Sequence, residues 1–92
     1  MNTYKTMNTD IEKLKNRIAD RKQRARLEHK HGSLEMAGMY EKDVEDLTDI
    51  LSFIQTGDFE SAWSTIYWVD TAVREEIPVR LYNFIAAENG VC

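Results

Sequence analysis

The residues best suited to bind a metal ion gather near the end of a basic segment. His29 and His31 are separated by one residue, Glu28 and Glu35 flank them, and Cys92 ends the chain. A zinc site needs at least three such side chains converging on one point. Two histidines at a helix end are equally well explained as exposed groups that interact favourably with the helix dipole. We therefore expect no metal and no cofactor.

Residues for covalent or acid–base catalysis do not form a recognisable set. Cys92 is terminal, and the neighbouring Glu75 and Glu76 project sideways, as is typical of a solvated helix end. The four glycines are dispersed and make no phosphate-binding loop. The serines fall where helix caps or helix surfaces are expected, namely Ser33, Ser52, Ser61 and Ser64. We expect a protein without enzymatic activity.

The net charge of -4 is unevenly divided along the chain. Residues 1–32 hold nine Lys or Arg and four Asp or Glu, a balance of 9 - 4 = +5. Residues 33–92 hold three and twelve, a balance of 3 - 12 = -9. Such a division indicates either a nucleic-acid-binding arm or two elements that attract each other within one fold.

The basic segment supports a nucleic-acid-binding regulator as the alternative function. Its cations are numerous enough for several phosphate contacts. The acidic balance of the whole chain and the lack of a helix-turn-helix pattern argue against it. If the alternative holds, the binding residues are Lys13, Arg17, Arg21, Lys22, Arg24 and Arg26.

Two other features indicate a protein partner. A row of carboxylates on the outer side of the second predicted helix is arranged either for solubility or to imitate a phosphate backbone. The aromatic residues of the last third exceed what a small helix bundle buries, and Trp and Tyr are enriched at interface hot spots. The predicted partner-binding residues are Glu45, Asp46, Asp49 and Trp68.

An unbroken heptad predicts a central helix over residues 34–55. One heptad position holds Ala37, Val44 and Leu51, and the other holds Tyr40, Leu47 and Ile54. A capping box at Thr9 and Glu12 predicts a preceding helix over 10–30, whose apolar seam is Ile11, Leu14, Ile18 and Ala25. Gly32 and Ser33 leave a short connection, so the two helices should be antiparallel.

The antiparallel pairing predicts a register in which facing residue numbers sum to about 65. Leu14 then meets Leu51, and Ile18 meets Leu47. The same register brings Arg24 near Glu41 and Lys22 near Asp43. Part of the charge division is thereby explained by ion pairs inside the fold, although exposed pairs contribute only about 0–1 kcal/mol each.

Two further helices are predicted over 59–75 and 78–89. Gly57 and Asp58 suit a helix end followed by an N-cap, and Pro78 suits a first helical turn. The run ILSFIQTGDFESAW resembles the turn of a tetratricopeptide-type hairpin, which implies two helices joined there. We predict an all-α protein, a single helix-bundle domain over 1–92, with 1–8 and 90–92 as loose ends.

The sequence favours a cytoplasmic location. No apolar run approaches the roughly 20 residues that span a bilayer, and the N-terminal residues lack a signal-peptide core. The one cysteine excludes an internal disulfide.

The closing run DTAVREEIPVRLYNFI, behind a charged helical hairpin, resembles the small accessory proteins of tailed bacteriophages. That resemblance implies action by binding a host or phage protein, including inhibition of defence systems such as CRISPR or restriction enzymes, in the host cytoplasm. We therefore expect a small non-catalytic protein-binding module, homodimeric, that inhibits a defence complex stoichiometrically. The partner is expected to be a host protein or nucleoprotein complex rather than a membrane.

Overall fold

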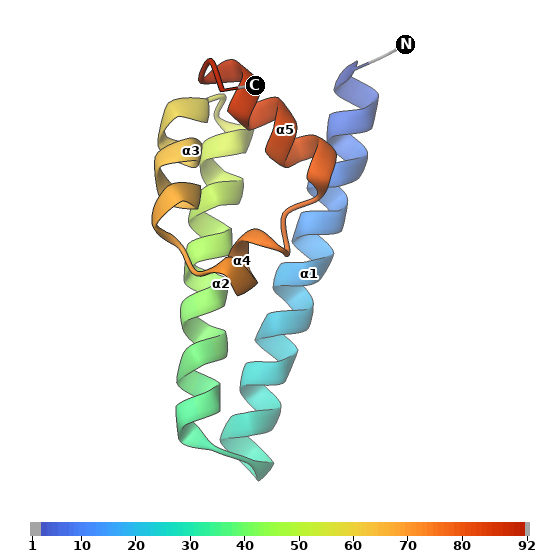
Figure 1. Ribbon diagram of the computed structural model, residues 1–92. Coiled ribbons are helices and arrows are strands. Elements are labelled where there is room, and N and C mark those ends of the chain that lie inside the picture. Colours follow the sequence, from blue (N-terminus) through green and yellow to red (C-terminus); the bar gives the residue numbers. More distant parts are fainter. Residues whose placement is uncertain (1–2, 92) are drawn as a thin grey trace.

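The structure is a computed structural model that describes residues 3–91, with side chains from residue 7 onward. All of its regular elements are helices, so the predicted all-α class is confirmed. They are α1 (Thr3–His31), α2 (Leu34–Gln55), α3 (Phe59–Trp68), α4 (Thr71–Arg74) and α5 (Val79–Glu88). In Figure 1, α1 and α2 form a long antiparallel hairpin, and α3 and α5 pack at the end farther from its loop. The loop end of the hairpin extends beyond this packing, and the extents of the molecule are 45 × 25 × 19 Å.

The hairpin follows the predicted register closely. One groove is lined by Lys15, Ile18 and Lys22 of α1 together with Thr48 and Leu51 of α2, and the adjoining one by Lys22, Ala25 and Arg26 together with Glu41 and Val44, as an antiparallel register near a sum of 65 requires. Ser33 caps α2 by accepting a hydrogen bond from the backbone N–H of Met36, at 3.2 Å. The connection therefore needs only two residues outside the helices.

The core lies where the hairpin meets the C-terminal helices. Apolar side chains from α1, α2, α3 and α5 form one buried cluster, extended by Val69, Val73 and Ile77 from the segment between α3 and α5. Burying such side chains is the main stabilising contribution to a small helical domain. The fully buried large side chains are Leu14, Leu47, Ile50, Ile66, Leu81, Ile85 and Val73.

Two predicted boundaries are wrong. α1 begins at Thr3 rather than near residue 10, so residues 3–8 are helical and not a loose end. The single helix predicted over 59–75 is two helices, because Val69 and Asp70 are extended (ψ 162° and 154°). Gly90 and Val91 follow α5 outside any helix, while residues 1, 2 and 92 of the predicted loose ends lie outside the described residues.

The break after α3 is stabilised by Arg74, the last residue of α4. Its guanidinium donates to the backbone carbonyls of Ile66 at 3.1 Å, Val69 at 3.0 Å and Tyr67 at 3.4 Å. These carbonyls belong to the end of α3 and the residue after it, where helix carbonyls lack intrahelical partners. A cation at a helix C-terminus also interacts favourably with the helix dipole.

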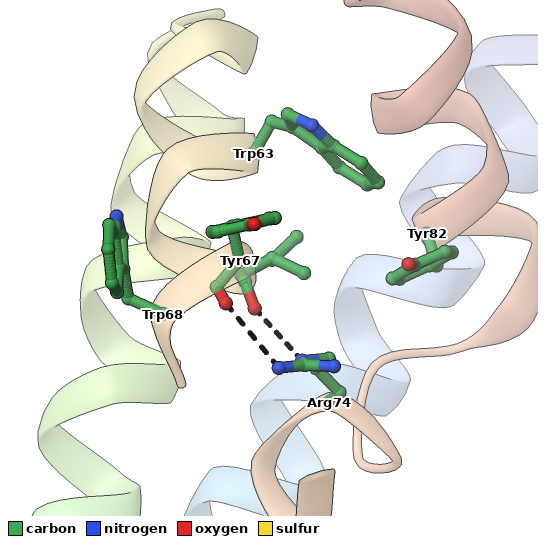
Figure 2. Close-up of a pocket in the computed structure, with 6 residues that line it drawn as sticks. Trp63, Tyr67, Trp68, Arg74 and Tyr82 are labelled. Atoms are coloured by element: carbon green, nitrogen blue, oxygen red, sulfur yellow. Dashed lines mark hydrogen bonds between the residues drawn. The ribbon is translucent and has the colours of Figure 1, made fainter. Parts of the chain in front are cut away.

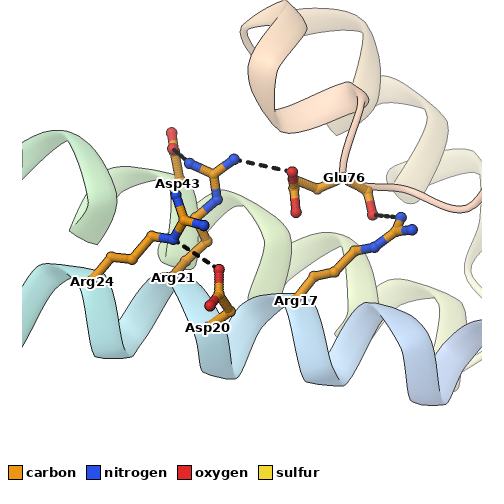
Figure 3. A network of polar contacts seen from close by, with 6 residues as sticks. All are labelled: Arg17, Asp20, Arg21, Arg24, Asp43 and Glu76. Atoms are coloured by element: carbon orange, nitrogen blue, oxygen red, sulfur yellow. Dashed lines mark hydrogen bonds and ion pairs between the residues drawn. The ribbon is translucent and has the colours of Figure 1, made fainter.

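A second arginine, Arg21, ties the C-terminal segment to the hairpin. It donates to Asp43 of α2 at 3.3 Å and to Glu76, which lies between α4 and α5, at 3.0 Å (Figure 3). Arg17, one turn earlier, donates to the backbone carbonyl of Glu76 at 2.5 Å. Burial raises the pKa of Asp43, partly opposed by Arg21, and the neighbouring carboxylates Asp46, Asp70 and Glu76 raise it further.

The two predicted ion pairs across the hairpin are replaced by others. Asp43 pairs with Arg21 rather than Lys22, and Glu41 contacts His29 rather than Arg24. Arg24 pairs instead with Asp20, one turn before it on α1, at 2.9 Å. Arg21 and Lys22 project about 100° apart on α1. Lys22 lines a hollow with Glu41 on one side of the hairpin, whereas Asp43 contacts Arg21 on the other.

Candidate functional site

A groove between α3 and α5, closed at one end by α4, is the most distinctive surface of the molecule. It has a volume of about 390 Å³ and is lined by four aromatic side chains, one isoleucine and one arginine. We call it the aromatic groove, and its residues are Trp63, Ile66, Tyr67, Trp68, Arg74 and Tyr82.

Packing between α3 and α5 fixes the walls of the aromatic groove. Trp63 and Tyr82 face each other from the two helices in an edge-to-face contact, with ring centroids 5.5 Å apart (Figure 2). Phe59 and Phe84 make a similar contact at 5.3 Å. Edge-to-face pairs contribute about 0.5–1.5 kcal/mol beyond their buried area, so these walls are preformed.

The far end of the aromatic groove exposes two aromatic rings. Trp68 is 80% exposed and Tyr67 is 68% exposed, although the two rings contact each other edge to face at 5.5 Å. Figure 2 shows Tyr67 on the groove side of α3 and Trp68 turned away from Tyr82. Two large adjacent aromatic side chains left in water are unusual for a small monomer and are typical of an interaction surface.

Arg74 gives the aromatic groove its one cation. The guanidinium is held by three carbonyls at the end of α3, and the dashed contacts in Figure 2 include those to Ile66 and Tyr67. These contacts fix the side chain without neutralising its charge, because carbonyl oxygens are uncharged acceptors. The groove is therefore apolar and aromatic, with one positively charged end.

The structure separates the predicted acidic residues from the aromatic groove. Glu45 and Asp49 of α2 are exposed, and neither lines the aromatic groove. Asp46 is mostly buried, and its hydrogen bond and charge raise the pKa of Lys42, whose amine lies 3.1 Å away. Of the four predicted partner-binding residues, only Trp68 lines the aromatic groove.

The six predicted nucleic-acid-binding residues fall into two groups. Arg17, Arg21 and Arg24 are engaged in contacts within the protein. Their guanidinium groups are only partly available to phosphates. The remaining three are exposed and have no ion-pair partner among the described residues, and they are Lys13, Lys22 and Arg26.

The described residues offer little for metal binding or membrane insertion. No group of three or more His, Cys, Asp or Glu side chains among them could hold a metal ion. His29 contacts Glu41, and the proposed ligand Cys92 lies outside the described part of the chain. Within residues 3–91, no helix combines the length and the apolar composition needed to cross a membrane.

The chain was compared with known protein families, curated proteins and solved structures. No family model, curated protein or solved structure matches the chain.

Sequence reasoning found the aromatic excess but not its arrangement. Arg74 was not singled out, although its position four residues after Asp70 fits the last turn of a short helix. That Trp63 and Tyr82 would face each other could not be read from the sequence, because it depends on how α5 packs against α3. The only sequence signal for the site was the number of Trp and Tyr residues in the last third.

Proposed function

We propose that the protein acts without catalysis, by binding another protein through the aromatic groove. The observation that carries this proposal is the exposure of Tyr67 and Trp68 beside the preformed wall of Trp63 and Tyr82. Aromatic side chains in a preformed groove lose little conformational freedom on binding, and such residues dominate interface energetics.

The proposed partner inserts an apolar side chain or short segment into the aromatic groove. A carboxylate or backbone carbonyl of the partner would approach Arg74, whose guanidinium is already oriented by the end of α3. Covering Trp68 removes up to about 200 Å² of aromatic surface from water, given the size of a Trp side chain. This area corresponds to roughly 5 kcal/mol as an upper limit.

The first test compares three baits in affinity capture from a bacterial lysate, followed by quantitative mass spectrometry. The baits are wild type, Trp68→Ala and a control, Leu34→Ala, which removes a 72% exposed apolar side chain at the start of α2. We expect a protein captured by wild type and Leu34→Ala, with binding weakened about 30-fold or more by Trp68→Ala.

The result is decisive in either direction when repeated with the purified partner. Equal affinity of wild type and Trp68→Ala for that partner would remove the aromatic groove from the proposal. Recovery of nucleic acid alone, lost at 200 mM salt, would favour the nucleic-acid-binding alternative instead.

The concrete form we propose is a phage-encoded inhibitor of a host defence complex, by the resemblance of residues 70–85 to phage accessory proteins. The test adds purified protein to CRISPR or restriction nuclease reactions. A stoichiometric inhibitor should reach full inhibition near one copy per nuclease complex, and Trp68→Ala should shift that titration. Full nuclease activity at a large excess of the protein would rule out the nucleases tested.

A further inference from the structure

A second groove runs along the hairpin between α1 and α2, away from the C-terminal helices. Two adjoining hollows of about 230 and 270 Å³ share Lys22 as a lining residue. Arg26 lines this hairpin groove and Arg17 contacts Glu76, and their separation of nine positions places the two side chains about 180° apart on α1. The hairpin groove therefore opens on the side of α1 opposite the α4–α5 segment.

The floor of the hairpin groove is apolar. Ile18 and Ala25 are buried there at 6% exposure each, while Val44 and Leu51 are only partly buried. Ala19 and Thr48, which line the same groove, are exposed, so this side of the hairpin faces solvent. A second layer packed over them would bury additional apolar surface.

The two walls of the hairpin groove carry opposite charges. Lys22 and Arg26 line the α1 wall, and both are exposed without an ion-pair partner among the described residues. Glu41 lines the α2 wall, and the exposed Glu45 follows it one helical turn later on the same side. The carboxylates of the α2 wall would repel the phosphates of a nucleic acid. They would equally repel a partner helix that carries only acidic side chains.

We propose that the hairpin groove binds the hairpin of a second copy of this chain, giving a two-fold symmetric four-helix layer. A two-fold axis parallel to the hairpin places α1 of each copy over α2 of the other, since such an interface is self-complementary. The register then brings Lys22 and Arg26 to the level of Glu41 and Glu45 of the other copy. Every basic wall meets an acidic wall.

The available area suits a weak dimer. Residues 11–29 of α1 span about 27 Å, and two helices side by side are about 18–20 Å wide. The covered face is then about 500 Å² per copy, or about 1,000 Å² in total, near the lower limit of specific interfaces. We expect a dimer that dissociates on dilution in the micromolar range.

The test is sedimentation equilibrium of wild type and two charge-reversal variants, with circular dichroism to verify folding. Lys22→Glu/Arg26→Glu makes both walls acidic, and Glu41→Lys/Glu45→Lys makes both walls basic. Each variant alone should weaken dimerisation about 30-fold or more. A one-to-one mixture should recover association, because acidic walls then meet basic walls at both contacts.

A matched control separates the groove from net charge. Lys13→Glu/Arg80→Glu produces the same change in net charge at two exposed positions outside the hairpin groove, and it should dimerise like wild type. A wild-type protein that stays monomeric to about 1 mM, a dimer indifferent to both reversals, or a mixture that fails to associate would each overturn the proposal. So would a monomer whose binding to DNA or RNA is lost in Lys22→Glu/Arg26→Glu.

Discussion

Replacing Arg21 by Ala should destabilise the fold far more than its position on a basic helix suggests. Its side chain is only 16% exposed and bridges Asp43 and Glu76, whose side chains are 18% and 26% exposed. The guanidinium also lies 5.7 Å from the ring centroid of Tyr40. The substitution leaves two half-buried carboxylates without their cation, which is costlier than losing an exposed pair.

The expected loss is about 2–3 kcal/mol at neutral pH. A hydrogen bond to a charged group contributes about 1.5–3 kcal/mol, and two are lost, but partial exposure screens both. For a domain of this size the loss corresponds to a Tm lowered by about 10–20 °C. Arg24→Ala is the matched control: its pair with Asp20 is more than half exposed, so it should cost far less stability than Arg21→Ala.

The pH dependence of the loss gives a second readout. Removing Arg21 raises the pKa of Asp43 further, because Arg21 is the group that lowers it. A carboxylate whose pKa is raised in the folded state makes the folded protein less stable as pH rises through that pKa. The difference in free energy of unfolding between wild type and Arg21→Ala should therefore be largest near neutral pH and smaller at about pH 4. Urea denaturation at both pH values measures it. A deficit equal to that of Arg24→Ala, or one that grows in acid, would refute this reasoning.

Three further predictions concern glycines in and after α2 and the capping residues Asn89 and Asp58. Gly57 has φ +78°, so Gly57→Ala should lower stability by about 1 kcal/mol. Gly38 lies inside α2 with open space at its Cβ position, so Gly38→Ala should raise stability by about 0.5–1 kcal/mol. Thermal melts in which both substitutions shift Tm in the same direction would contradict this. Asn89→Ala removes a 3.0 Å hydrogen bond to the carbonyl of Phe59 and should cost about 1–2 kcal/mol in urea, whereas a wild-type midpoint would show that the bond contributes nothing. Hydrogen bonds from Ser61 lower the pKa of Asp58, so the Tm difference between wild type and Asp58→Ala should be present at neutral pH and vanish as pH falls through that lowered pKa; a constant difference would exclude the carboxylate as the cap.

The hairpin was predictable because its information is local. A heptad on α2, a matching seam on α1 and a two-residue connection fix both pairing and register, and Leu14, Ile18 and Leu47 are buried as that register requires. The individual ion pairs were not predictable at this level. Lys22 and Arg21 are adjacent in sequence but project about 100° apart on α1, so the partner of Asp43 depends on which side of the hairpin that carboxylate occupies.

The break between α3 and α4 was missed for a physical reason. Ile66, Val69 and Val73 follow each other at spacings of three and four, which is the period of a continuous helix. All three are buried, but Ile66 belongs to α3, Val73 belongs to α4, and Val69 is an extended residue between the two helices. The spacing of apolar residues indicates which side chains are buried, and it does not indicate whether the helix is continuous. At the break, Arg74 donates hydrogen bonds to the carbonyls of Ile66 and Val69, and the apolar pattern gives no sign of this contact.

The sequence indicates that aromatic residues are available for a partner, but it does not indicate where in the fold they gather. Trp68 was expected to be free for a partner and is 80% exposed. The acidic residues grouped with it lie elsewhere, and one of them, Asp46, is paired with Lys42. Which aromatic residues share a groove depends on packing between α3 and α5, elements joined only through the irregular segment around α4.

The link between Glu76 and α1 has a consequence for how the chain folds. Arg17 and Arg21 reach Glu76 across 59 and 55 residues of sequence, whereas Arg21 reaches Asp43 across only 22. Closing the shorter loop costs less chain entropy, so the hairpin should assemble first and the C-terminal segment should dock onto it afterwards. Weakening that late contact with Glu76→Gln should then leave the refolding rate nearly unchanged and accelerate unfolding, so the segment that builds the aromatic groove governs the lifetime of the native state.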